Sequence, residues 1–176
     1  MAPLTYLGEY IFSGCDNLSQ IILPKTITRI GSFAFEGCSN LETVHLSEEL
    51  IKIEGGAFSG CTALKEMVLP ESVQEIGASI FKGCSNLRSI VLTPQIQLIP
   101  MYAFSGCSNL EAIDIPSGVQ TIVDYAFEDC ASLQELRIPH SVLYIYDRAF
   151  SGCIGLKRLY IDMSTIETGI LISRVA

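Results

Sequence analysis

The seven cysteines are the residues of this chain with the richest chemistry, because thiolates bind metal ions, form disulfides and act as nucleophiles. Each cysteine follows the previous one by 23 residues, at Cys15, Cys38, Cys61, Cys84, Cys107, Cys130 and Cys153. Zinc sites place a second cysteine or a histidine within a few residues of the first, and no cysteine here has such a neighbour. The fixed spacing predicts a column of buried, free thiols, with a thiol-based metal or redox protein as the alternative.

Other residue types with catalytic potential are scattered. The two histidines, His45 and His140, lie in distant repeats and so share neither a metal site nor a catalytic triad. The chain contains no G-x-S-x-G sequence, no phosphate-binding loop and no H-E-x-x-H sequence. Its carboxylates are spread over variable positions instead of forming a general acid and base pair. We therefore predict that the protein is not an enzyme and uses no cofactor and no metal.

The cysteine spacing is one column of a 23-residue repeat. A phenylalanine precedes every cysteine by three residues, and a leucine follows every cysteine by three residues. A period between 20 and 50 residues is typical of solenoid proteins, in which each repeat forms one coil of a stack. The phenylalanine column contains Phe12, Phe35, Phe58, Phe81, Phe104, Phe127 and Phe150.

Each repeat predicts one coil with two extended segments. The L-x-x-I-x-L segment, as at residues 18–23, alternates apolar with variable residues, which is the period of a strand with one buried face. Proline often ends this strand, and a V/I-x-x-I segment such as residues 73–76 forms a shorter extended piece on another side. We expect the A-F-x-G-C segment to form one helical turn, with its glycine in the left-handed region. No coil buries its apolar residues alone, so the coils must stack with parallel strands.

The full motif, L-x-x-[IV]-x-[LI]-P-x-x-[VI]-x-x-I-x-x-x-A-F-x-G-C, resembles the leucine-rich repeat of the BspA-like (treponemal) subfamily over residues 4–164. The resemblance implies an α/β repeat fold, a right-handed leucine-rich-repeat solenoid with a parallel β-sheet on its concave face. It also implies a recognition or adhesion role, because members are commonly surface proteins that bind host proteins or matrix components. We expect one domain over residues 1–176, with seven repeats at 4–164 and a degenerate partial repeat at 165–176. A structural spacer within a longer surface protein is the alternative function.

The variable strand positions form the predicted partner-binding surface. They alternate with the buried columns, so their side chains should lie on the open, concave face of the sheet. Exposed apolar residues on such a face often mark a binding site, although β-branched residues also simply suit a sheet surface. The predicted contact residues are Gln20, Ile22, Thr43, His45, Glu66, Val68, Ser89, Val91, Asp114, Glu135, Arg137, Arg158 and Tyr160.

Composition narrows the class of partner. The 176 residues include 11 Lys and Arg against 19 Asp and Glu, which gives a formal net charge of −8. Without a basic stripe, a nucleic acid is not expected as a partner. No apolar run approaches the ~20 residues that span a bilayer, so we expect no membrane insertion. Glutamates crowd the second and third repeats. The predicted partner on the concave face is a protein, or else a glycan or matrix component.

The N-terminal sequence gives information on where in the cell the protein acts. It carries no basic stretch followed by an apolar run, so no signal peptide is predicted. The family resemblance implies a cell-surface or secreted protein, whereas free thiols leave a cytoplasmic location open.

The N-terminal coil contains core-type residues with nothing upstream to cover them, namely Leu4, Leu7, Ile11 and Phe12. We therefore expect either self-association through the N-terminal coil or a place within a longer array.

Overall fold

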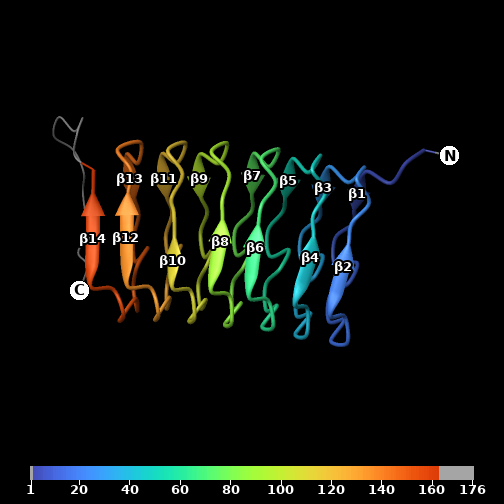
Figure 1. The fold of residues 1–176 in the computed structure, drawn as a ribbon, viewed down its shortest axis with the longest axis horizontal. Coiled ribbons are helices and arrows are strands. Elements are labelled where there is room, and N and C mark those ends of the chain that lie inside the picture. The colour runs from blue at the N-terminus through green and yellow to red at the C-terminus, as the bar shows by residue number, and fades with distance from the viewer. Residues whose placement is uncertain (1, 163–176) are drawn as a thin grey trace.

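The computed structural model describes residues 2–162, and it confirms the repeat, because each 23-residue segment forms one coil of a parallel β-solenoid. The coils lie side by side along the long axis of the molecule, from the N-terminal end to the C-terminal end (Figure 1). Every coil has three sides: a longer strand, a shorter strand and a segment of turns. Alternate strands of the chain therefore form two rows, which we call the front face and the rear face.

The front face carries the L-x-x-I-x-L strands that the sequence predicts. These strands are β2 (Gln20–Ile22), β4 (Thr43–His45), β6 (Glu66–Val68), β8 (Ser89–Val91), β10 (Ala112–Ile113), β12 (Glu135–Ile138) and β14 (Arg158–Ile161). Parallel ladders join β2 with β4, β6 with β8 and β10, and β12 with β14. The register pairs residues one repeat apart, as in Gln20 with Thr43 and Val68 with Val91. Equivalent positions of successive repeats therefore lie next to one another along the face.

The rear face carries the shorter extended segments, which the sequence also predicts. Its strands are β1 (Tyr6–Leu7), β3 (Arg29–Ile30), β5 (Lys52–Ile53), β7 (Glu75–Ile76), β9 (Leu98–Ile99), β11 (Thr121–Ile122) and β13 (Tyr144–Ile145). Parallel ladders run through β1, β3, β5 and β7, and through β9, β11 and β13. In Figure 1 this row lies behind the front strands, so the two faces enclose the interior of each coil.

The third side consists of turns, and residues 2–162 contain no helix, so the expected helical turn and the α/β description are not confirmed. The N–H groups of Phe33, Phe35 and Gly37 donate to carbonyl oxygens of the next coil at 2.9, 2.8 and 2.8 Å. In a helix these groups would donate within their own segment. Phe33 and Gly37 have positive φ angles of 56° and 68°, which a right-handed helix excludes. The predicted left-handed glycine is therefore confirmed, but it belongs to a turn.

A stack of phenylalanine rings forms the centre of the core. Successive rings of Phe35, Phe58, Phe81, Phe104 and Phe127 have centroids 5.2 to 5.8 Å apart and planes within 15° of parallel. All five side chains are fully buried. Parallel aromatic rings at this distance are favourable when they are offset, and each ring also removes a large apolar area from water. The stack explains why one residue type recurs at this position in every coil.

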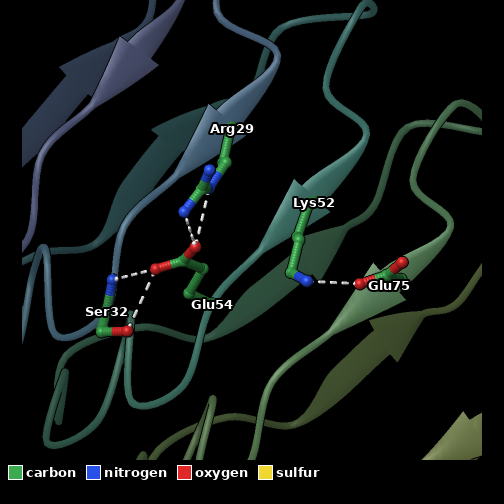
Figure 2. A network of polar contacts seen from close by, with 5 residues as sticks. All are labelled: Arg29, Ser32, Lys52, Glu54 and Glu75. Carbon is green, nitrogen blue, oxygen red and sulfur yellow. Dashed lines mark hydrogen bonds and ion pairs between the residues drawn. The ribbon is translucent and has the colours of Figure 1, made fainter.

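The rear face of the second to fourth coils carries a polar network (Figure 2). The Glu54 carboxylate accepts hydrogen bonds from Arg29 Nε at 2.7 Å and from the Ser32 N–H and hydroxyl at 3.1 Å each. Burial alone would raise the pKa of Glu54, but the hydrogen bonds from Arg29 and Ser32 outweigh it and hold the pKa below its usual value. Beside it, Lys52 Nζ lies 2.5 Å from Glu75 Oε2, with both side chains well exposed.

Truncation of a central ring should destabilise the stack. We expect Phe81→Ala to lower the free energy of unfolding by ~3–5 kcal/mol, the usual effect of removing a fully buried phenylalanine side chain. Phe12→Ala is the matched control, because Phe12 is the same residue of the repeat but is only half-buried in the first coil. Denaturant unfolding should give a clearly smaller loss for Phe12→Ala, and equal losses would contradict the buried stack.

Glu54 should make stability depend on pH. A carboxylate with a lowered folded-state pKa stabilises the fold above its unfolded pKa of ~4.3, and this contribution disappears as the pH falls through the folded pKa. We expect Glu54→Gln to cost ~1–2 kcal/mol at pH 7 and clearly less near pH 3. Glu75→Gln, which removes the exposed pair, should change stability by at most ~0.5 kcal/mol at either pH. Urea unfolding at both pH values measures this, and a Glu54→Gln loss that does not change with pH would refute the role given to Glu54.

Candidate functional site

The structure brings all of the predicted contact residues to the front face. All are exposed except Glu135, which is half-buried, and Asp114 lies directly after β10. Strand β6 illustrates the alternation, because Glu66 and Val68 are exposed while Met67 between them is only 4% exposed. These side chains therefore lie on one face over seven neighbouring coils, in three ladders that comprise β2 and β4, β6 to β10, and β12 and β14.

Apolar side chains interrupt this otherwise polar face. Ile22, Val68 and Val91 are 70%, 65% and 55% exposed. Val68 lies opposite Val91 in the ladder between β6 and β8, whereas Ile22 lies opposite His45. The predicted apolar stripe is thus a valine pair in the middle of the face and a separate isoleucine near the N-terminal end.

Charged and aromatic side chains at the C-terminal end of the front face contact one another. The Arg158 guanidinium lies 2.7 Å from Glu135 Oε2, and Arg137 is 3.8 Å from the other oxygen of the same carboxylate. The Arg137 guanidinium also lies over the Tyr160 ring, 4.4 Å from its centroid. These ionic and cation–π contacts already engage both arginines, Arg137 and Arg158.

A groove crosses the front face at β4 and β6, with a volume of about 760 Å³. We call it the acidic groove, and its charged and exposed apolar lining residues are Glu42, Glu48, Lys65, Glu66, Val68 and Glu71. Lys65 Nζ lies 3.2 Å from Glu42 Oε2, which is the one ion pair at the groove within the described residues. The groove is therefore acidic overall, with an exposed valine between its charged groups.

Sequence reasoning placed Thr43, His45, Glu66 and Val68 at this site but did not include Glu42, Glu48, Lys65 and Glu71 among the contact residues. The sequence does contain a signal for these residues, because charged residues recur at the same position of successive repeats. Glu48 and Glu71 are one repeat apart, and so are Glu42 and Lys65. Residues of one column lie side by side in neighbouring coils, so two adjacent charged columns indicate a charged border along the strands.

The cysteine column lies inside the turn side of the solenoid. From the second coil on, each thiol donates to the carbonyl oxygen of the phenylalanine 26 residues earlier, as Cys84 Sγ does to Phe58 at 3.0 Å and Cys107 Sγ to Phe81 at 3.2 Å. The prediction that the whole column is buried is wrong at the first coil, where Cys15 is exposed, and Cys153 is half-buried. Each thiol from Cys38 on is covered by the coil before it, and among residues 2–162 no coil covers Cys15 in this way.

The buried thiols are poorly suited to redox or metal chemistry. Burial raises the pKa of Cys84 to about 12 and also raises the pKa values of Cys38, Cys61 and Cys107. A thiol that stays protonated at neutral pH is a weak nucleophile and a weak metal ligand. Among residues 2–162, no three His, Cys, Asp or Glu side chains form a group that could hold a metal ion. The geometry therefore gives the thiol-based alternative no support.

The two histidines lie in separate parts of the front face and the bend beside it. His45 is exposed on β4 and lines the acidic groove. His140 is exposed in the bend after β12, with its Nδ1 3.8 Å from Asp162 Oδ2. They are not brought together, so no catalytic pair arises from them.

The first coil matches its predicted exposure only in part. Leu4 and Ile11 are 56% and 52% exposed and Phe12 is half-buried, but Leu7 is buried. Leu7 belongs to the buried core, and its backbone pairs with Ile30 of β3. Self-association through this coil stays a prediction, and the degenerate partial repeat at 165–176 lies outside the described residues.

Stacked parallel coils of 23 residues, each contributing leucine, phenylalanine and cysteine to one core, define a leucine-rich-repeat solenoid. A family model described as "BspA type Leucine rich repeat region", in six copies, matches residues 2–108 and 75–171. The chain therefore belongs to the BspA-type leucine-rich-repeat family. Leucine-rich-repeat proteins are generally protein-interaction or scaffold modules.

Several solved structures are similar to this chain. A leucine-rich repeat protein from T. pallidum is 33% identical with a TM-score of 0.83, over 88% of this chain and 72% of that one. A leucine rich cell surface protein from Faecalibacterium prausnitzii is 30% identical with a TM-score of 0.70, over 92% and 52%. A leucine-rich repeat protein from Bacteroides ovatus is 32% identical with a TM-score of 0.67, over 85% and 45%. The chain thus spans about half the length of the last two proteins.

Two further findings are negative. No curated protein matches the chain. Within residues 2–162, the structure has no helix with the length and apolar character that crossing a membrane requires.

The thiol geometry predicts a graded reactivity. At pH 7.5 we expect Ellman's reagent to modify Cys15 rapidly and Cys153 slowly, and to modify the buried cysteines only after denaturation, because burial keeps them protonated and inaccessible. Cys15→Ser should abolish the rapid phase and leave the total in denaturant lower by one thiol. Rapid modification of Cys84 in the native protein, located by peptide mapping, would contradict the buried column.

Proposed function

We propose that the chain is a non-catalytic recognition module that binds a protein partner through its front face. This proposal takes the front face as the concave side of a right-handed solenoid, as the family resemblance implies. The observation that carries it is the exposure of Ile22, Val68 and Val91 on strands whose other outward residue is polar. Exposing these side chains to water is unfavourable, and a partner that covers them would remove that cost.

The arrangement of the face supports recognition over other roles. Its outward residues vary from coil to coil, whereas the inward columns repeat, so the surface changes along its length without a change of fold. A related protein named as a leucine rich cell surface protein supports the proposal that this chain acts at a cell surface, in adhesion or binding. Since the chain spans only part of such relatives, these roles refer to the segment described.

A scaffold role is the second candidate, and the continuous ring stack favours it. Rings from Phe12 to Phe150 stack through every coil, which gives the solenoid a stiff core suited to holding other domains apart. A scaffold requires no binding face, so the same experiment separates the two functions.

The test uses a phage-displayed library of random peptides selected on the folded protein. We expect the recovered peptides to bind Ile22→Ser/Val68→Ser/Val91→Ser at least about tenfold more weakly than the wild type, because tenfold corresponds to only ~1.4 kcal/mol and a single hot-spot side chain contributes ~2 kcal/mol or more. The matched control is Ile51→Ser/Leu98→Ser/Leu143→Ser, which removes three exposed apolar side chains at or beside the rear strands. Circular dichroism and thermal melting check that both variants fold.

Peptide affinities from fluorescence anisotropy decide the outcome. Loss of binding in the front variant with retention in the rear variant supports the proposed face. Equal loss in both variants, or no recovered binder, favours the scaffold.

A further inference from the structure

We infer that the acidic groove takes a basic peptide segment in which lysine or arginine side chains alternate with small apolar ones. This inference rests on the proposed recognition function and adds the chemistry of the partner. The groove has the size of a binding site, about 760 Å³, and it lies on the same face as the exposed valine pair. The unpaired carboxylates of the groove and its exposed valine both support a basic peptide as the occupant.

The negative charge of the groove is not balanced by the protein itself. Four carboxylates line it against the single ammonium of Lys65, and that ammonium already pairs with Glu42. In the part of the chain that the structure describes, no ion pair or hydrogen bond reaches the carboxylates of Glu48, Glu66 or Glu71. Unbalanced charge around a concave surface attracts a partner of opposite charge and speeds its encounter.

The rear face of the same region provides the contrast. There, Glu54 is held by Arg29, and Glu75 by Lys52 (Figure 2). Carboxylates of neighbouring coils are thus neutralised within the chain on the rear face, whereas Glu48, Glu66 and Glu71 at the acidic groove have no counter-charge among the described residues. The difference indicates that the cations for these three groove carboxylates come from outside the chain.

The apolar part of the groove selects among cations. Glu66 and Val68 are two positions apart on β6, so their side chains project from the same face of the strand. Lysine and arginine combine an apolar stem with a charged end, and a stem that lies on Val68 places its cation beside Glu66. A metal ion or a small amine would use the carboxylates but leave the valine exposed.

A second copy of this chain is a poorer occupant. The arginines on its front strands are Arg137 and Arg158, and both already contact Glu135, with Arg137 also on Tyr160. Moving them to another molecule would break these contacts. The occupant we assign is therefore a segment of another protein.

The experiment measures the binding of a fluorescein-labelled Lys-Val-Lys-Val-Lys-Val-Lys peptide by anisotropy. We expect binding that weakens with added salt, since exposed charges more than ~10 Å apart are screened at 0.1 M ionic strength. Glu66→Gln/Glu71→Gln should weaken it at least about tenfold. The matched control is Glu9→Gln/Glu36→Gln, which removes the same charge on the turn side and should bind like the wild type.

Two further peptides and one further measurement complete the test. A Lys-Ser analogue should bind several-fold more weakly than the Lys-Val peptide, and a Glu-Val analogue should not bind. Equal binding of the Lys-Ser peptide, or equal loss in both double variants, overturns the inference. A concentration-dependent dimer that Glu66→Gln/Glu71→Gln abolishes, seen by light scattering, also overturns it in favour of a second copy. If library peptides require Val91 but are not basic, the recognition face stands and the basic occupant is rejected.

Discussion

Hydrogen bonding between neighbouring coils is the interaction on which the rest of this structure depends. On the turn side, the Phe35 N–H donates to Ala57 at 2.8 Å, and the Cys61 thiol donates back to the Phe35 carbonyl at 3.2 Å. Buried polar backbone groups must find partners, and here most of those partners lie in another coil. Every coil must therefore have the same length and the same path, and side chains of the same shape must fill it. The recurring phenylalanine and cysteine columns follow from that geometric requirement.

The same requirement separates the inside of the molecule from its outside. Inward columns are fixed because each side chain packs on its own equivalents, as Phe58 does on Phe81. Outward strand positions face solvent and need not match in shape, so Val68, Asp114 and Tyr160 occupy equivalent places of the repeat without disturbing the core. Sequence variation is thus concentrated where a partner would meet it, and this is the structural reason for regarding the front face as the functional surface.

Local pattern alone predicted the strands and the buried columns, because alternation along residues 18–23 and its repeats reports directly on which side chains face inward. The turn side was harder. The Cys38 N–H donates to the Phe35 carbonyl at 3.1 Å, a bond that a helical turn and a β-turn share, and only the contacts to the next coil separate the two. Exposure of Cys15 depends on a missing neighbour, not on its own repeat. The acidic groove escaped notice because Glu48 and Glu71 belong to bends, where the two-residue period of a strand no longer indicates direction.

Because successive coils pack on each other in the same way, whole 23-residue repeats can be added to the array or removed from it. Removal of residues 73–95 would join two coils whose facing cores already match, because the same phenylalanine ring contact recurs at every junction, as Phe58 on Phe81. The front face would change abruptly at the same time, because Val68 on β6 would then lie opposite Asp114 instead of Val91. Unequal recombination between repeats therefore supplies new surfaces from old coils, and a gene built in this way can change what its product contacts in one step while each coil keeps its fold.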